Sequence, residues 1–429
     1  MRSSTHPLIR RIVRSPLVLR LVLFSSVFGP ATITAMADND ASGVATLSLA
    51  GATLGYPILF LFLITTPLLA ITQEMGMRLA LVTRRGLADL IREKFGVKAS
   101  LLIFAALVVA NLGTVTVELS AIKTTSTMLN IPAIPFVLGI MGISFLTVTR
   151  GSYKITQAIM LLVSLFYLVY IVSAVKANPD WGLAISNLVY PHGVEFTPAY
   201  LRNYLFIGMG VVGTMITPWG QFFISSFAFD KNIEAGKIIF SQIETYVGSF
   251  ITHFIAFFLV VATAATLFTH GITLTTGEEA ALAIEPFTGR FASVLFAAGL
   301  LNAGFIGLVV VSLSTAYAFS EFFGTSGSLD SNFKQSKLFY WIYILQIIIA
   351  GGIAILPGIS LFKLAVFTQT LNAVALPLVF YYLIHLTSNK TLMGAHVNSG
   401  LKKWMAIAGS VLIFVASAVT LVFTFIELQ

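Results

Sequence analysis

Apolar runs of about 20 residues recur along most of this chain, and mostly short polar segments separate them. Of its 429 residues, 57% are hydrophobic and only 10% are charged. A soluble domain carries roughly 25% charged residues. Because the bilayer core offers no water to satisfy backbone groups, only helices and closed barrels can span it. Runs of this length are typical of spanning helices, so the sequence predicts an all-α polytopic membrane protein.

We expect eleven spans within one transmembrane domain that covers residues 1–429. The apolar runs that define them are 20–50, 55–81, 100–128, 132–149, 155–175, 200–228, 243–269, 290–323, 338–355, 361–387 and 404–427. Spans 1–5 (about 20–175) and 6–10 (about 200–387) are expected to form two repeats, followed by an extra helix at about 404–427. An odd number of spans in each repeat makes the second repeat inverted relative to the first.

Basic residues are concentrated in alternate connections between these spans. The N-terminal tail and the connections after spans 2, 4, 6, 8 and 10 carry Arg10, Arg11, Arg14, Arg84, Arg85, Arg92, Lys94, Lys98, Arg150, Lys154, Lys231, Lys237, Lys334, Lys337, Lys390, Lys402 and Lys403. Because cytoplasmic loops are rich in Lys and Arg, we expect a protein of the cytoplasmic (inner) membrane with its N-terminus inside and its C-terminus outside. The net charge of +8 reflects these loops and does not indicate a nucleic-acid partner.

Several classes of chemistry are excluded by what the sequence lacks. It has no cysteine, which excludes disulfides and thiolate metal sites. It also has no phosphate-binding loop, nucleophile elbow or His-rich metalloprotease motif. We therefore expect neither an enzyme nor a resident cofactor.

Two of the apolar runs are interrupted in the middle. In the first, the segment "ADNDASGVAT" (37–46) places Asp40 and Gly43 where a continuous spanning helix would be apolar. In the sixth, the segment "TPWG" (217–220) contains Pro218, which breaks helices. These two spans correspond in the two repeats, and paired interrupted helices indicate a transporter binding site at the bilayer midplane.

The two breaks would expose backbone carbonyls at the negative poles of two helix dipoles. Asp40 adds a full negative charge, and Thr214 and Thr217 add hydroxyl oxygens. Gly43 lets the unwound backbone bend. Such a site favours a cation that prefers oxygen ligands.

The stretch "FGPATITAMADNDASGVATLSLAG" resembles the first helix of the NRAMP divalent-metal transporters, whose signature is Asp-Pro-Gly-Asn, one further residue, and Ala-Thr. Three further stretches, "TQEMGMRLALVTRRGLADLIREKFG", "GTMITPWGQFFISS" and "TQTLNAVALPLVFYYLIHLTSNKTLMG", are similar to the second, sixth and tenth helices of that family. The resemblance covers spans 1 to 10 in order. It implies the LeuT-type fold, with a five-plus-five inverted repeat, an eleventh helix and discontinuous helices 1 and 6.

The chain departs from this family at positions that the resemblance assigns to the metal site. The signature aspartate is kept as Asp40 and the tenth-helix glutamine as Gln369, but Gly43 replaces the asparagine ligand. Thr217 replaces the sixth-helix methionine, whose thioether binds transition metals in the family, and Trp219 replaces the motif histidine. Soft sulfur favours softer metals, whereas hydroxyl and carbonyl oxygens suit hard ions.

The family also has an acidic pair in its third helix that takes part in proton transfer. Here the matching positions are Asn111 and Thr114 or, with a shifted alignment, Val115 and Glu118. Either alignment leaves the acidic pair broken. The pattern is similar to the NRAMP-related magnesium transporters of prokaryotes, and it implies transport that is not coupled to protons.

We therefore expect a monomer that imports Mg²⁺, and also Mn²⁺, by alternating access, with the ion largely hydrated. One alternative is a proton-coupled Mn²⁺/Fe²⁺ transporter of the NRAMP type, and another is a non-transporting NRAMP-like sensor. Membrane lipid is the other expected partner. The residues expected to bind the metal are Asp40, Thr217, Gln369, Gly43 and Thr214.

A second group of polar residues is assigned to the surroundings of the ion or to its pathway: Asn372, Gln221, Trp219, Asp38, Asn111, Thr114 and Glu118. Asp38 and Asp40 face different directions if they continue a helix, and the resemblance selects Asp40. Glu118 either lines a vestibule, lies at the membrane edge or forms a structural ion pair with Lys123. Trp219 is either a gate or a residue that fills space.

Overall fold

The computed structural model describes residues 23–272, 274, 290–358 and 360–427. Every regular element in these ranges is a helix, which confirms the predicted all-α architecture. The α-helices are α3 (Pro30–Ala37), α4 (Ala41–Leu54), α5 (Phe60–Thr83), α6 (Leu87–Met128), α7 (Ala133–Arg150), α8 (Tyr153–Ser164), α9 (Leu168–Lys176), α10 (Trp181–Ser186), α11 (Pro198–Met215), α12 (Pro218–Asp230), α13 (Ile238–Thr266), α15 (Arg290–Phe323), α16 (Lys337–Ile355), α17 (Leu361–Thr387), α18 (Lys390–Met393) and α19 (Gly400–Glu427). Short 3₁₀ turns are η1 (Tyr56–Leu59), η2 (Leu165–Tyr167), η3 (Ala235–Lys237), η4 (Phe268–His270) and η5 (Gly394–His396).

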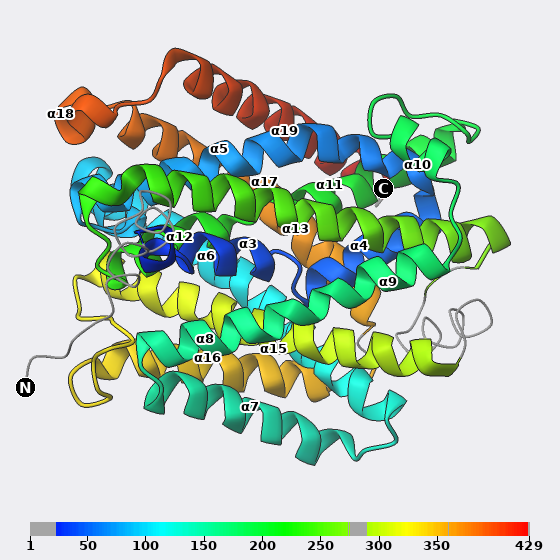
Figure 1. The fold of residues 1–429 in the computed structure, drawn as a ribbon, viewed down its shortest axis with the longest axis horizontal. Coiled ribbons are helices and arrows are strands. Elements are labelled where there is room, and N and C mark those ends of the chain that lie inside the picture. Colours follow the sequence, from blue (N-terminus) through cyan, green and yellow to red (C-terminus); the bar gives the residue numbers. More distant parts are fainter. Residues whose placement is uncertain (1–22, 273, 275–289, 359, 428–429) are drawn as a thin grey trace, which may run out of the picture.

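Among the described residues, ten helical segments are long and apolar enough to cross a membrane, by length and composition. They correspond to the expected spans 2 to 11, and the broken pair α3 and α4 forms the first span. In Figure 1, α3 and α4 follow one another from left to right, and α19 runs in the same direction. With an odd number of crossings, the first and the last span run in the same direction. The basic tail and residues 20–22 of the first expected span lie outside the described residues.

The structure corrects the prediction at the start of the third span. Sequence analysis places residues 87–99 in a connection, whereas α6 begins at Leu87 and kinks at Gly96, whose φ is 83°. Arg85 and Arg92 both pair with Asp89, at 2.5 and 2.7 Å. Ion pairs at this spacing stabilise helical turns outside the apolar core, so charged residues extend the helix here instead of ending it.

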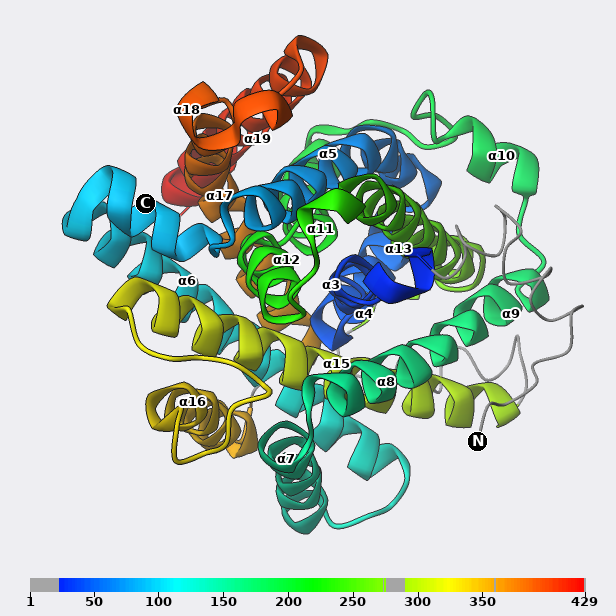
Figure 2. The ribbon, with the colours of Figure 1, turned by 60° about the vertical axis from the view of Figure 1, so that its left-hand side comes forward.

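The broken first span lies at the centre of the molecule. In Figure 2, α3 and α4 are surrounded by α11, α12, α13 and α15. Helix α3 packs against α13, α12 and α8, while α4 packs against α13, α11, α17 and α15. Residues 29–48 are all buried, as are residues 213–228 around the second break. Both breaks are therefore enclosed by protein, which is one setting in which irregular backbone is tolerated at membrane depth; the other is the lining of a water-filled cavity.

Candidate metal site at the two helix breaks

The first break separates α3 from α4, and Asp38, Asn39 and Asp40 connect them. Asp40 is the N-cap of α4, since its Oδ1 accepts a hydrogen bond from the backbone N–H of Gly43 at 2.7 Å. Its side chain is fully buried, and its Oδ2 has no hydrogen-bond partner within the described ranges. A buried polar atom left without a partner costs roughly 1–3 kcal/mol. The free oxygen is thus available to a ligand.

The second break has the same local design. Helix α11 ends at Met215, and Ile216 and Thr217 are extended before α12 begins at Pro218. Thr217 is the N-cap of α12, and its Oγ1 accepts from the backbone N–H of Gly220 at 3.1 Å. In both breaks the capping side chain lies three residues before a glycine. Pro218 occupies the first position of α12, where its missing N–H would have had no intrahelical partner.

Oxygens from the two breaks converge beside Gly43. A Cβ on Gly43 would lie 2.7 Å from the carbonyl oxygen of Asp38, 2.7 Å from Thr214 Oγ1 and 3.4 Å from Asp40 Oδ1. In the described part of the chain the Thr214 hydroxyl also has no hydrogen-bond partner. A carboxylate, a carbonyl and a hydroxyl thus lie close together around residue 43, which is possible because it has no side chain. Such an oxygen set suits a hard divalent cation.

Asp38 joins the two breaks directly. Its Oδ1 accepts from Thr217 Oγ1 at 2.8 Å, and its Oδ2 accepts from Gln73 Nε2 of α5 at 3.2 Å. Because residues 38–40 are not helical, Asp38 and Asp40 can both face the region between the breaks. The expectation that the two carboxylates face different directions holds only for a continuous helix, and the helix is interrupted here. Gln73 was not singled out in the sequence, although it is a polar residue inside an apolar span.

A third carboxylate lies at the start of α4. Glu118 of α6 accepts from the backbone N–H of Ala41 at 2.9 Å and of Ser42 at 3.2 Å. Helix N-termini attract negative charge, which accounts for this position. The alternative of an ion pair with Lys123 is wrong, because the Lys123 ammonium donates to carbonyls at the end of α16, including that of Ala354 at 3.1 Å.

Helix α15 packs tightly on these acidic side chains. A Cβ on Gly307 would lie 2.5 Å from Glu118 Cδ and 2.8 Å from Asp40 Cβ. Only glycine allows so close an approach, so α15 fixes the relative positions of the two carboxylates.

Gln369 reaches the first break through Ser42. Its Nε2 donates to the Ser42 hydroxyl, and its Oε1 accepts from Asn372 Nδ2 at 2.8 Å. Asn372 also donates to Thr114 Oγ1 at 3.3 Å, so this chain of hydrogen bonds connects α4, α17 and α6. In this conformation the Gln369 oxygen faces Asn372, and binding a metal through it would require the amide to turn. Ser42 is a contact that sequence reasoning missed.

Three other predicted residues surround the breaks without joining the oxygen cluster. Asn111 donates to Thr315 Oγ1 at 2.8 Å and so links α6 to α15. Trp219 is fully buried, its backbone carbonyl accepts from Ser314 at 2.9 Å, and its indole Nε1 has no partner within the described residues. Gln221 is buried, and neither atom of its amide has a partner within the described residues.

The basic loops predict that the N-terminal end of α3 lies nearer the cytoplasm. Charged side chains bind the backbone at this end. Glu244 Oε1 accepts from the backbone N–H of Gly29 at 2.6 Å and of Thr32 at 3.1 Å. The Lys231 ammonium donates to the carbonyl of Val27 at 3.0 Å. Burial lowers the pKa of Lys231 to about 8, because it disfavours the charged form. Both half-helices of the first span therefore have a buried glutamate at their N-termini.

The Met215 sulfur and the His253 imidazole, which lie near the second break, both contact other protein groups. Met215 Sδ accepts from Thr65 of α5 at 3.4 Å. His253 Nε2 lies 3.3 Å from the Met215 carbonyl oxygen. The described residues contain no group of three or more His, Cys, Asp or Glu that could hold a metal ion. A metal at the breaks would thus rely on hydroxyl and carbonyl oxygens beside the carboxylates.

Comparisons with known proteins agree with this architecture. The family described as "Natural resistance-associated macrophage protein-like" (Nramp) matches residues 31–423. A relative, the divalent metal cation transporter MntH of Granulibacter bethesdensis, is 22% identical over 411 residues, which cover 92% of this chain and 88% of the relative.

Solved structures show the same fold at low identity. A manganese transporter of Eremococcus coleocola has a TM-score of 0.73 and 17% identity, covering 94% of this chain and 87% of that one. A nucleobase-cation-symport-1 family transporter has a TM-score of 0.58 and 14% identity, covering 92% of each chain. These likenesses confirm the predicted LeuT-type fold.

Proposed function

This chain belongs to the Nramp family, and from that membership we propose that it carries divalent metal ions across the cytoplasmic membrane by alternating access. The single observation that supports a metal site most strongly is the oxygen cluster beside Gly43: the Thr214 hydroxyl has no partner among the described residues, and Asp40, whose Oδ1 caps Gly43, keeps its Oδ2 unpartnered. The relatives named above as divalent metal cation and manganese transporters support the same class of substrate. The ion is the substrate and not a resident cofactor.

We assign Mg²⁺ as the main ion, with Mn²⁺ as a second substrate. The side chains at the breaks supply carboxylate and hydroxyl oxygens, and the nearby sulfur of Met215 is engaged by Thr65. Magnesium is usually held through one or two carboxylates with several waters retained. The missing side chain at position 43 lets the Asp38 carbonyl and the Thr214 hydroxyl lie close to Asp40. An ion that keeps several waters would need more space between the two breaks than this enclosed conformation provides.

A proton-coupled Mn²⁺ transporter is the second candidate, and two observations favour it. The solved neighbour is described as a manganese transporter, and the named relative is described as a divalent metal cation transporter without mention of magnesium. In addition, Glu118 lies beside Asp40 at the start of α4, so a carboxylate is available to exchange protons there. The two candidates differ in the feature on which they rest. The oxygen ligands at the breaks favour Mg²⁺, whereas proton exchange at the buried Glu118 carboxylate would favour the proton-coupled Mn²⁺ transporter.

Uncoupled uptake is energetically sufficient for a divalent ion. Moving one charge through 100 mV is worth about 2.3 kcal/mol, so a divalent cation gains about 4.6 kcal/mol. That gain supports roughly a thousandfold accumulation. Loss of the third-helix acidic pair is therefore compatible with transport.

The test is ion flux into liposomes under a negative-inside potential. Internal indicators follow Mg²⁺ or Mn²⁺, a second dye follows pH, and Asp40→Asn serves as the transport-deficient control. Mg²⁺ entry without acidification, absent in the variant, is the expected result. Entry of Mn²⁺ alone, together with protons, would establish the second candidate. Absence of flux for both ions from folded protein would point to a non-transporting sensor.

A further inference from the structure

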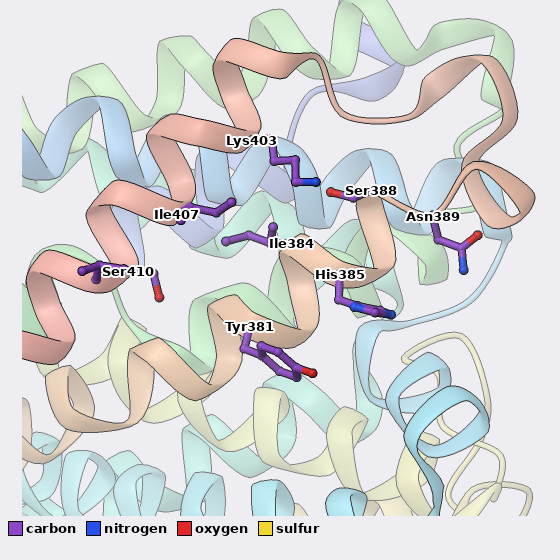
Figure 3. Close-up of a pocket in the computed structure, with 9 residues that line it drawn as sticks. Tyr381, Ile384, His385, Ser388, Asn389, Lys403, Ile407 and Ser410 are labelled. Atoms are coloured by element: carbon purple, nitrogen blue, oxygen red, sulfur yellow. The ribbon is translucent and has the colours of Figure 1, made fainter.

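A cleft opens between the end of α17 and the beginning of α19, far from the helix breaks. It has a volume of about 560 Å³, within the range that accommodates small ligands. Figure 3 shows its lining: side chains from α17 and the segment after it face those of α19.

The cleft has a basic, polar end near α18 and a more apolar stretch along the two helices, which also includes Ser410. Lys403, Ser388 and Asn389 form the end near α18. Ile384, Ile407 and Val411 continue the cleft along the two helices. An amphipathic ligand with a polar head and an apolar tail would match this gradient.

The two neighbouring lysines of α19 differ in their partners. The Lys402 ammonium lies 3.5 Å from Glu74 Oε2 and donates to the Tyr246 hydroxyl at 2.6 Å. For the Lys403 ammonium, no hydrogen bond or ion pair occurs among the described residues. In Figure 3 its side chain extends from α19 toward the end of α17, where Ser388 lies. The cleft thus presents an uncompensated positive charge to its ligand.

The surroundings place this charge at the edge of a membrane. Leu401 and Trp404 flank the lysine pair, and both are largely exposed, at 74% and 68%. Exposed tryptophan is enriched where the apolar core of a bilayer meets the headgroups. Lys390 and Lys403 also lie in the connection that the distribution of basic residues assigns to the cytoplasmic side. Basic pockets between helices on that side suit anionic lipid headgroups.

We propose that this cleft binds one anionic phospholipid of the cytoplasmic leaflet. Its phosphate would lie at Lys403 and Ser388, and an acyl chain would follow Ile384, Ile407 and Val411. The lipid would brace α17 against α19. Gln369 and Asn372 also belong to α17, and Gln369 contacts the first break through Ser42. A lipid that holds α17 against α19 would therefore affect the position of this helix at the break.

The proposal is tested with the full chain in nanodiscs that contain phosphatidylglycerol and phosphatidylcholine, followed by native mass spectrometry of the retained lipid. We expect the wild type to retain phosphatidylglycerol preferentially. One basic contact at a membrane surface corresponds to about a fivefold change in binding, so Lys403→Gln should lower that preference about fivefold. Lys337→Gln is the matched control, because this exposed lysine lies on the same predicted side but at the start of α16.

A second variant tests the apolar half of the cleft. Ile407→Trp fills it while leaving Lys403 in place, and it should also lower retention of phosphatidylglycerol. Equal retention of the two lipids by the wild type, or an unchanged preference in Lys403→Gln, would overturn the proposal. Loss in Lys403→Gln but not in Ile407→Trp would indicate surface charge alone and also overturn it. Displacement of the lipid by millimolar inorganic phosphate would assign the cleft to a free anion instead.

Discussion

The two helix breaks have the same geometry but different charge. Each has a capping side chain, Asp40 or Thr217, that accepts from the N–H of a glycine three residues later. The first break also contains Asp38, and Glu118 of α6 accepts hydrogen bonds beside it. The second break contributes hydroxyls and backbone carbonyls instead. The local fold is thus repeated, while the charge is confined to one repeat.

This asymmetry has a physical reason. Each charge buried in a membrane costs roughly 2.5–3.5 kcal/mol on insertion scales. Except for Asp40 Oδ2, the carboxylate oxygens at the first break accept hydrogen bonds from Thr217, Gln73 and the N–H groups at the start of α4. A second set of carboxylates would add cost without a matching set of donors. We therefore propose that the first break attracts the ion and that the second positions it.

The largest effect is expected from removing the charge at the first break. Asp40→Asn preserves shape but replaces the unpartnered Oδ2 or its capping oxygen by an amide nitrogen. Uptake of Mg²⁺ and Mn²⁺ should fall by at least about a hundredfold, since even outer contacts of metal sites are worth 10–100-fold. Thr217→Val, the equivalent cap at the second break, should cost markedly less. Initial rates in liposomes at matched protein content measure both, and equal losses would contradict the division of roles.

The glycines after the two caps should also differ. In Gly43→Ala the new methyl group would lie 2.7 Å from the backbone oxygen of Asp38, which cannot move without shifting the break. In Gly220→Ala it would meet the Thr217 hydroxyl at 2.6 Å, a side-chain atom that can rotate. Overpacking costs about 1–3 kcal/mol, so Gly43→Ala should reduce transport roughly tenfold or more.

The measurement for this pair is metal affinity by isothermal titration, together with the melting temperature of the purified proteins. Gly43→Ala should lose affinity and also lower the melting temperature, because the new methyl group overpacks the first break against the Asp38 carbonyl. A Gly220→Ala variant that loses more affinity than Gly43→Ala would show that the ion lies nearer the second break.

The two glutamates that cap the halves of the first span provide the next comparison. Glu118→Gln removes the charge at the start of α4 and at least one of its two accepted hydrogen bonds. Hydrogen bonds to charged groups are worth about 1.5 kcal/mol or more, so transport should fall roughly tenfold. Glu244→Gln keeps one oxygen for the N–H groups of Gly29 and Thr32 and should change affinity less. Concentration dependence of Mg²⁺ uptake distinguishes them, and a larger loss of affinity in Glu244→Gln would contradict the prediction.

The smallest effect is a change in ion preference at the second break. Thr217→Met introduces a thioether, and sulfur favours softer metals, so Cd²⁺ should compete with Mg²⁺ several-fold better, about 1 kcal/mol. Thr217→Leu is the control, because it removes the same hydroxyl without adding sulfur. Competition of Cd²⁺ against Mg²⁺ uptake is the readout. The same shift in both variants would rule out direct binding by residue 217.

Sequence patterns predicted the spans and both breaks because hydropathy and helix breakers are local properties. Residues 290–323, for example, coincide with α15. The local pattern did not predict the contacts of Asp38 or Gln73, nor the capping of α4 by Glu118. Helical periodicity gives side-chain directions only where the backbone is helical, and residues 38–40 and 216–217 are not. Contacts there depend on which other helices approach.

By itself, the sequence determined that this protein spans a membrane and breaks two corresponding helices, and that Asp40 contributes a charge at the first break. These features follow from the length and polarity of each segment. Only the tertiary structure decided that Thr214 faces Gly43, that Asp38 contacts Thr217 and that Gln369 reaches the break through Ser42. Each of these contacts joins residues far apart in the chain, so it exists only after α4, α11, α12 and α17 pack together.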